Sequence, residues 1–103
     1  MIDINKALRS AIETGETVIG STKTINEAKL GKAKLIIIAA NCPKDIKEDI
    51  EYYAALSGIP VYNYSGTSVE LGSACGKAFG IAALAIKNQG NSDIMRVIEG
   101  AQK

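Results

Sequence analysis

Residues that could act as nucleophiles, bases or metal ligands are few in this chain of 103 residues. It contains two cysteines, Cys42 and Cys75, and no histidine. Serine–histidine and cysteine–histidine catalysis both require an imidazole base, so the sequence excludes them. A zinc site needs about four nitrogen or sulfur ligands, which two cysteines without histidine do not supply. We therefore expect no catalytic residue, no metal site and no cofactor.

Three other patterns leave chemical alternatives open. Cys42 directly precedes a predicted helix, where a thiol pKa can be lowered enough for nucleophilic attack. We favour another interpretation for both cysteines, namely that they are small apolar residues in a reducing cytosol. Residues 72–77 resemble a phosphate loop but lack its spacing and the Ser or Thr after the lysine. The acids of residues 45–51 alternate with lysines at helical spacing, which is typical of a solvated helix face.

Three short segments carry groups suited to binding an anion or a base. Residues 20–23, Gly-Ser-Thr-Lys, open a predicted helix whose free backbone amides favour a phosphate. Asn41, followed by Lys44, comes after a predicted strand and can either hydrogen-bond a base edge or cap a helix. Phe79, which follows Gly76-Lys77-Ala78, can stack on a splayed base or fill the core, and its residue type alone favours the core. Binding is therefore the expected activity.

The charges of the chain are nearly balanced. Twelve Lys and Arg residues against eleven acids give a net charge of +1, and 47% of residues are hydrophobic, as in an ordinary globular protein. This balance argues weakly against nucleic acid, but four lysines fall within residues 22–34, and a single basic face is enough to bind phosphates. We recognise no signal peptide and no apolar run of about 20 residues, so an intracellular protein without membrane contact is expected.

Hydrophobic periodicity predicts alternating helices and strands. The second helix has two candidate caps, Ser21 and the Thr24–Glu27 capping box. Within residues 34–40, the segment from Leu35 to Ala40 is an apolar run without alternation. Such a strand requires helices on both faces of the sheet, which predicts a three-layer α/β/α sandwich in one domain, residues 1–103. The expected helices are 3–14, 21 or 24 to 31, 43–57, 67–75 and a short closing helix with Ile94, Val97 and Ile98, and the expected strands are 17–20, 34–40, 61–64 and 78–86.

Long segments of the chain resemble a known family. Residues 18–43 and 48–79, with the closing helix, resemble the L-thirty-e family of large-subunit ribosomal proteins, part of the wider L-seven-Ae group of kink-turn RNA binders. The most specific pieces are GKAKLIIIAANCP, EYYA-LSG-PVY and VELG-A-GK-F, in that order. The resemblance implies a four-stranded mixed sheet and a structural role in the cytoplasmic ribosome. It also implies binding to a kink-turn in ribosomal RNA, contacts with neighbouring ribosomal proteins and a monomer off the ribosome.

The same resemblance assigns RNA-contact positions residue by residue. It implies that the backbone at Gly20 approaches the RNA, that Asn41 hydrogen-bonds a base, and that Phe79 stacks or packs against an extruded base in a third contact loop. Two positions depart from the family pattern: Ser21-Thr22 replace a tyrosine and a basic residue, and Gly80 replaces a basic residue, so both changes remove contacts. The expected RNA-binding residues are Gly20, Ser21, Thr22, Lys23, Asn41, Lys44, Gly72, Gly76, Lys77 and Phe79.

Three other interpretations remain. One is a ribosome-associated RNA-binding protein of the L-seven-Ae type that is not a structural subunit. Another is a small doubly wound α/β enzyme, against which the missing histidine and the incomplete phosphate loop both count. The third is a protein-interaction module, which would show no affinity for RNA at any salt concentration.

Overall fold

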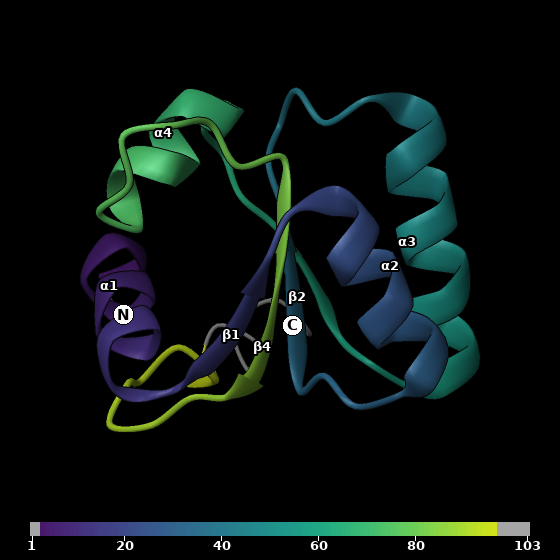
Figure 1. Cartoon of the computed structure of the whole chain (residues 1–103), viewed down its shortest axis with the longest axis horizontal. Coiled ribbons are helices and arrows are strands. Elements are labelled where there is room, and N and C mark those ends of the chain that lie inside the picture. Colours follow the sequence, from purple (N-terminus) through teal and green to yellow (C-terminus); the bar gives the residue numbers. More distant parts are fainter. Residues whose placement is uncertain (1–2, 97–103) are drawn as a thin grey trace.

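The computed structural model of the protein describes residues 3–96, and in these residues helices and strands alternate along the chain (Figure 1). None of the helices within residues 3–96 is long and apolar enough to cross a membrane. Of the expected closing helix, Ile94 is buried, whereas Val97 and Ile98 lie outside the described residues. The helices are α1 (Ile4–Thr14), α2 (Ser21–Leu30), α3 (Lys44–Ser57) and α4 (Ser68–Ala74), and the strands are β1 (Glu16–Ile19), β2 (Leu35–Ile38), β3 (Val61–Asn63) and β4 (Ala83–Asn88).

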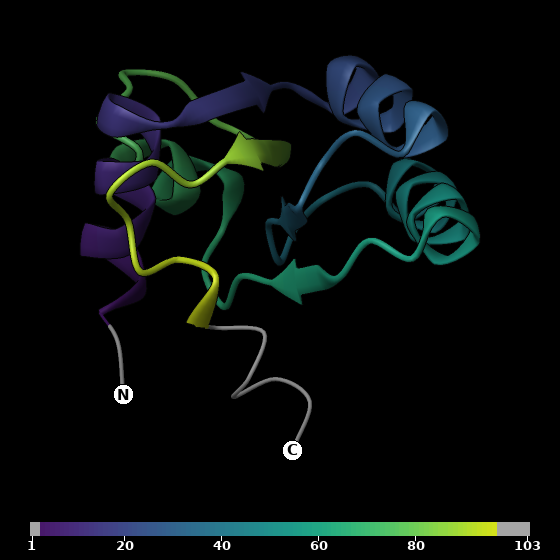
Figure 2. The same ribbon diagram turned by 90° about the horizontal axis from the view of Figure 1, so that it is seen from below.

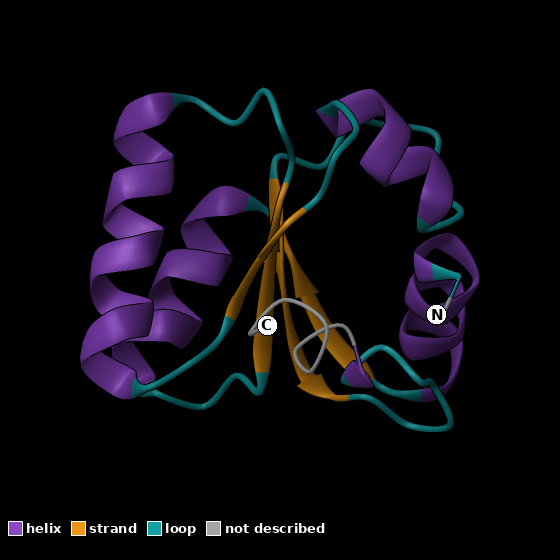
Figure 3. Cartoon of the chain, turned by 180° about the vertical axis from the view of Figure 1, so that it is seen from behind, coloured by secondary structure: helices purple, strands orange, loops and turns teal. Residues whose placement is uncertain are grey.

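The strands form one mixed sheet in the order β1-β4-β2-β3. β2 and β3 run parallel, joined through the crossover helix α3, whereas β4 is antiparallel to both β1 and β2. Figure 3 shows the twisted sheet nearly edge-on between two helical layers. The predicted mixed sheet is therefore confirmed.

Helices cover both faces of this sheet. α1 and α4 lie on one face, and α2 and α3 lie on the other (Figures 1 and 3). The β2 side chains alternate between them: Leu35 and Ile37 join the core under α1 and α4, and Ile36 and Ile38 join the core under α2 and α3. All four are essentially fully buried, and each burial contributes roughly 1.5–3 kcal/mol. The three-layer α/β/α sandwich is confirmed.

Helix starts followed the predicted capping signals in two cases and departed from them in α2. Asp3 caps α1, and Thr67 with Glu70 forms the predicted capping box of α4. Both caps predicted for α2 were wrong: its N-cap is Gly20, Ser21 is already helical, and Thr24 is fully buried in the first turn. The helix begins early because the Gly20 N–H donates to the Ala83 carbonyl, which fixes a tight exit from β1.

The strand predicted at 78–86 was the largest error. β4 starts at Ala83, and residues 78–80 are exposed in a loop. The loop is tied to α4 on both sides of residues 78–80, because the Lys77 N–H donates to the Gly72 carbonyl and the Ile81 N–H to the Ser68 carbonyl. The first part of this predicted strand, residues 78–82, is therefore loop. The other strands differ from their predicted bounds by one or two residues at an end.

The two described ends of the chain lie on the same side of the molecule. Figure 2 shows both the start of α1 and the last described turn at the edge below the sheet. Asp3 and Arg96 line one groove there.

Candidate nucleic-acid interface

The three segments expected to bind meet at one edge of the sheet, at the top of Figure 1. A short connecting segment, residues 81–83, holds them together. The Gly20 N–H donates to the Ala83 carbonyl at 3.1 Å, the Ala39 N–H donates to the Ala82 carbonyl at 2.9 Å, and the Ile81 N–H donates to the Ser68 carbonyl at 2.9 Å. We call residues 20–23, 39–44 and 76–83 the junction edge. Its parts are fixed to one another by backbone hydrogen bonds.

At the start of α2, backbone amides face outward without acceptors in the helix. Gly20 has φ +115°, which strains any other residue, and a Cβ added there would meet nothing within 4 Å. The first amide with a helical acceptor is that of Thr24, which donates to the Gly20 carbonyl. No side chain caps the helix, so the N–H groups of residues 21–23 and the positive end of the helix dipole favour an anion. Thr22 and Lys23 are exposed beside them.

Asn41 connects two parts of the junction edge. Its Oδ1 accepts a hydrogen bond from the backbone N–H of Ser68, the first residue of α4, at 2.7 Å. The expected capping role is therefore real, but the helix that it caps is α4, 27 positions further along the chain. The residue is exposed, and an amide carries two N–H donors in addition to its oxygen. Asn41 can thus hold the loop with one atom and donate to a ligand with the other.

Phe79 lies on the surface and does not fill the core. Its side chain is 58% exposed in the loop between α4 and β4. The loop lies directly on Gly72, where an added Cβ would fall 1.9 Å from the Phe79 carbonyl oxygen. Gly72 is buried within α4 and not in the contact loop. Its position allows the loop to approach the helix and present the aromatic ring outward.

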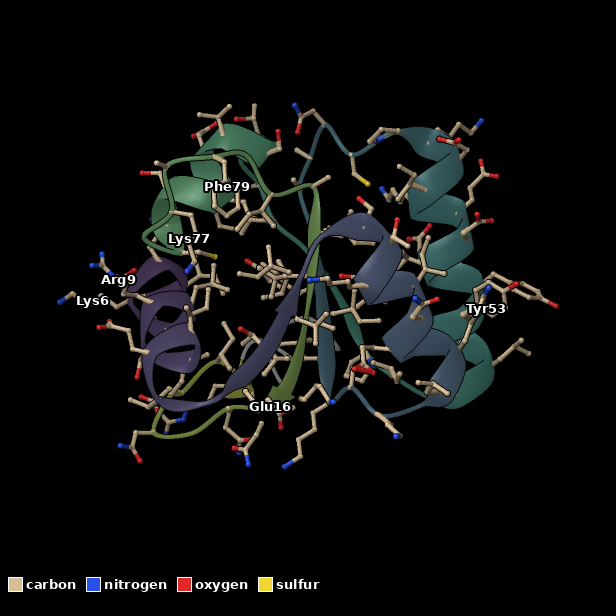
Figure 4. All side chains as sticks on the ribbon, viewed as in Figure 1. Lys6, Arg9, Glu16, Tyr53, Lys77 and Phe79 are labelled. Carbon is tan, nitrogen blue, oxygen red and sulfur yellow. The ribbon has the colours of Figure 1, made fainter. Side chains whose placement is uncertain are left out.

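Lysines flank the ring and the amide on both sides. Gly76, with φ +79°, makes the turn that leads from α4 to the exposed Lys77. In Figure 4, Lys77 lies below Phe79 and beside Arg9. Lys44 opens α3 at the other side; its side chain is 90% exposed, and its 3.8 Å contact with Glu48 is a weak surface pair. All three segments of the junction edge therefore carry a lysine.

Neither cysteine is activated as a nucleophile. Both are free and buried. Burial raises the pKa of the Cys42 thiol despite the opposing charge of Lys47, and burial raises the pKa of Cys75 to about 11 despite Lys77. The possibility of a lowered pKa at Cys42 was wrong because the side chain turns into the core before α3 begins. Within residues 3–96 no three His, Cys, Asp or Glu side chains are grouped so that they could hold a metal ion.

Two features of the junction edge had no sequence signal. The Asn41–Ser68 hydrogen bond spans 27 positions, and only a tertiary structure brings those residues together. The packing of Gly76 against Arg9, where an added Cβ would lie 2.9 Å from the guanidinium Nε, is equally non-local. A partial signal existed for Arg9, since Lys6 and Arg9 are spaced i, i+3 away from the apolar stripe of α1.

Comparisons with known proteins agree with this architecture. A solved structure described as a protein with unknown function from Bacillus halodurans C matches with a TM-score of 0.80 at 18% identity, covering 97% of this chain and 96% of that one, which shows the fold. A protein of Methanothermobacter thermautotrophicus named "Large ribosomal subunit protein eL30" is 54% identical over 97 residues, covering 94% of this chain and 99% of the relative. The protein of the same name from Methanopyrus kandleri is 48% identical over 103 residues, 100% of this chain and 94% of that relative.

The match to a protein family extends over the whole sandwich. Residues 2–96 match the family described as "Ribosomal protein L7Ae/L30e/S12e/Gadd45 family". This span includes every helix and strand of the structure and all parts of the junction edge. The resemblance carried by the sequence motifs is thus confirmed, and the chain belongs to the Ribosomal protein L7Ae/L30e/S12e/Gadd45 family.

Proposed function

We propose that this protein is a structural component of the large ribosomal subunit in the cytoplasm and that it binds a kink-turn in ribosomal RNA. The names of relatives that are 48–54% identical over nearly the whole chain support the ribosomal role. The same names describe ribosome components, which supports the expectation of no catalytic activity. Ribosomal RNA and neighbouring ribosomal proteins are the proposed partners, and residues 1–103 act as one RNA-binding domain that is monomeric off the ribosome.

The observation that carries the RNA proposal is the exposed ring of Phe79 on the same edge of the sheet as an uncapped helix start, to which the segment ending at Ala83 is hydrogen-bonded. A regular A-form stem offers side chains little access to its base edges, whereas a bend with an internal loop splays bases outward. An extruded base stacks on the exposed ring, a contact worth about 1–3 kcal/mol per base. The amides of residues 21–23 receive a phosphate at the same time. Such a combination selects a bent stem over a straight one.

Other residues of the junction edge complete the proposed contact. The Asn41 amide donates to a base edge while its oxygen stays on the Ser68 N–H. Ser21 and Thr22 contribute hydroxyls, and the lysines neutralise phosphates on either side. Gly20, Gly72 and Gly76 act through the backbone, since Gly20 opens the surface and the other two shape the loop. The lysines in question are Lys23, Lys44 and Lys77.

A gel-shift titration at controlled salt tests the proposal. The purified protein is titrated against a kink-turn RNA and a straight duplex of matched length and base composition. We expect tight binding to the bent RNA and weak, salt-sensitive binding to the duplex. Equal weak affinity for both RNAs, or none for either, contradicts the proposal. Sedimentation of the free protein is expected to show a monomer.

A further inference from the structure

A line of exposed cations continues from the junction edge onto α1. In Figure 4, Phe79, Lys77, Arg9 and Lys6 follow one another down the same side of the molecule. The contact between α1 and the α4–β4 loop is close, because a Cβ added to Gly76 would lie 2.9 Å from Nε of Arg9. We call Lys6, Arg9 and Lys77 the basic strip. All three are exposed, so their charges are accessible to a ligand.

The strip borders a polar groove of about 520 Å³ between α1 and α4. Lys6 and Arg9 line one wall, and Ser73 and Glu70 line the other. The Tyr64 hydroxyl donates to Asn5 Oδ1 at 2.7 Å across its floor, which ties α1 to the core beneath. The groove therefore has a fixed shape with cations at its rim.

The acids near the strip do not neutralise it firmly. Glu13 Oε1 lies 3.5 Å from Arg9 Nε, but both side chains are about 60% exposed, and such a pair contributes little and is readily exchanged. Glu70 is engaged in the α4 capping box, where Oε1 accepts the Thr67 N–H. A phosphate can offer Arg9 a bidentate contact, which is stronger than the single contact with Glu13.

On the opposite side of the sheet, α3 is the acid-rich element (Figure 1). The α3 sequence has two lysines against four acids, and all four acids are exposed. An RNA stem that leaves the junction edge is repelled along α3 and attracted toward Lys77 and the cations of α1. The longest extent of the molecule is 28 Å, and a nucleic-acid duplex carries a phosphate charge about every 1.7 Å of its axis. Many phosphates thus come within reach of the strip.

We propose that the basic strip, which extends the junction edge from Lys77 onto α1, binds the phosphate backbone of the RNA stem flanking the bend. This inference rests on the proposed function, because the stem is positioned by the bound kink-turn. The contact is independent of sequence, since it involves phosphates and no base edge. It would add affinity as that stem lengthens, until the stem extends past the strip.

Two kink-turn RNAs that differ only in the length of each flanking stem test the strip. In one, the stems are short; in the other, each extends beyond the 28 Å of the protein. Wild-type protein is expected to bind the long RNA more tightly. The double variant Lys6→Ala/Arg9→Ala is expected to lose this gain and to keep wild-type affinity for the short RNA. Its slope of log affinity against log salt on the long RNA should fall by about 0.9 for each lost phosphate contact.

The double variant Lys32→Ala/Lys34→Ala is the matched control. It removes the same charge from exposed positions at the other end of α2, and it should behave as wild type on both RNAs. A Lys6→Ala/Arg9→Ala protein that keeps the long-stem gain overturns the inference, and so does a control that loses the gain equally. In both cases the proposed function stands if wild type still prefers bent RNA over a straight duplex. Absence of that preference in wild type is failure of the proposed function instead.

Discussion

Asn41 shows how one side chain at the junction edge serves both folding and binding. Its oxygen is committed to the Ser68 N–H, and its amide hydrogens remain for a ligand. Two glycines also differ in what their missing side chains allow. Gly20 leaves open space outside the backbone, whereas Gly72 leaves room for the Phe79 carbonyl. Substitutions that remove the structural contact and keep the ligand contact, or the reverse, therefore distinguish effects on stability from effects on RNA binding.

Asn41→Ala and Asn41→Asp distinguish the two tasks of this side chain. Alanine removes the hydrogen bond to Ser68 and should cost about 1 kcal/mol of stability. Aspartate keeps the acceptor and should melt like wild type. Both variants should lose affinity for the bent RNA, because neither has the amide donor and the carboxylate also repels phosphate. Thermal melts and RNA titrations check this; wild-type binding by Asn41→Asp would show that the amide makes no contact.

Gly72→Ala should damage both stability and binding. A methyl group there would fall 1.9 Å from the Phe79 carbonyl oxygen, so the loop must move off α4. We expect a loss of about 1–3 kcal/mol, as in overpacked cores, together with weaker binding to the kink-turn RNA. Ser73→Ala, at an exposed position of the same helix, is the control and should change neither quantity. Denaturant unfolding and RNA titration provide the two readouts.

The secondary-structure elements were predictable where their signals are local. The apolar stripe of α1, the Thr67–Glu70 capping box and the buried run of β2 all depend on residues close in sequence, and all were found. The failures depend on distant contacts. Residues 78–82 are loop, with the Ile81 N–H bonded to Ser68 of α4, and α2 starts at Ser21 directly after Gly20, whose N–H is bonded to Ala83. The site was likewise predictable as three segments, but not the bonds that hold them together.

One ion-pair cluster joins three elements and gives a pH-dependent prediction. Lys87 of β4 lies 3.1 Å from Glu27 of α2 and 3.8 Å from Glu16 of β1. The hydrogen bond to Glu27 is the main cause of the raised pKa of Lys87. A cation whose pKa is raised by folding stabilises the protein fully below its unfolded pKa, about 10.4 for lysine. This stabilisation is lost as pH rises through the higher folded value.

Glu27→Gln should weaken the dependence of stability on pH above about 10.4. The free energy of unfolding of the wild type is expected to fall as pH rises above about 10.4, and the fall should be smaller in the variant because Lys87 then has a pKa nearer its unfolded value. Glu13→Gln, which removes an exposed acid from α1, should keep the wild-type slope. Urea unfolding over this pH range measures the difference; equal slopes in Glu27→Gln and wild type would contradict the assigned role of the pair.

The whole molecule has a net charge of only +1, yet its charges are unevenly placed. Each segment of the junction edge carries an exposed lysine, and α1 carries Lys6 and Arg9, whereas α3 has four exposed acids against two lysines. Net charge alone therefore gave a misleading argument against nucleic acid, since the placement of charge around the fold decides which face attracts RNA. The fold creates this asymmetry by setting α1 and α4 on one side of the sheet and α3 on the other (Figure 1).

Phosphate contacts and base contacts should separate in mutants. Lys23→Ala is expected to weaken binding to bent and straight RNA alike and to lower the salt slope by about 0.7–0.9, because it removes one phosphate contact. Phe79→Ala should reduce binding to the bent RNA only, and Phe79→Tyr should restore it, since a tyrosine ring can still stack. Salt-dependent titrations of the three variants test this; equal losses on both RNAs for Phe79→Ala would contradict it.

The most direct test of the account is to map backbone amide chemical shifts while a kink-turn RNA is added to the isotopically labelled protein. Bend-selective recognition at the junction edge predicts large changes at residues 21–23, at Asn41 and at residues 76–79. It predicts little change at Tyr52 and Leu56, which are exposed on α3. Changes concentrated on α3, with the junction edge unaffected, would contradict the account.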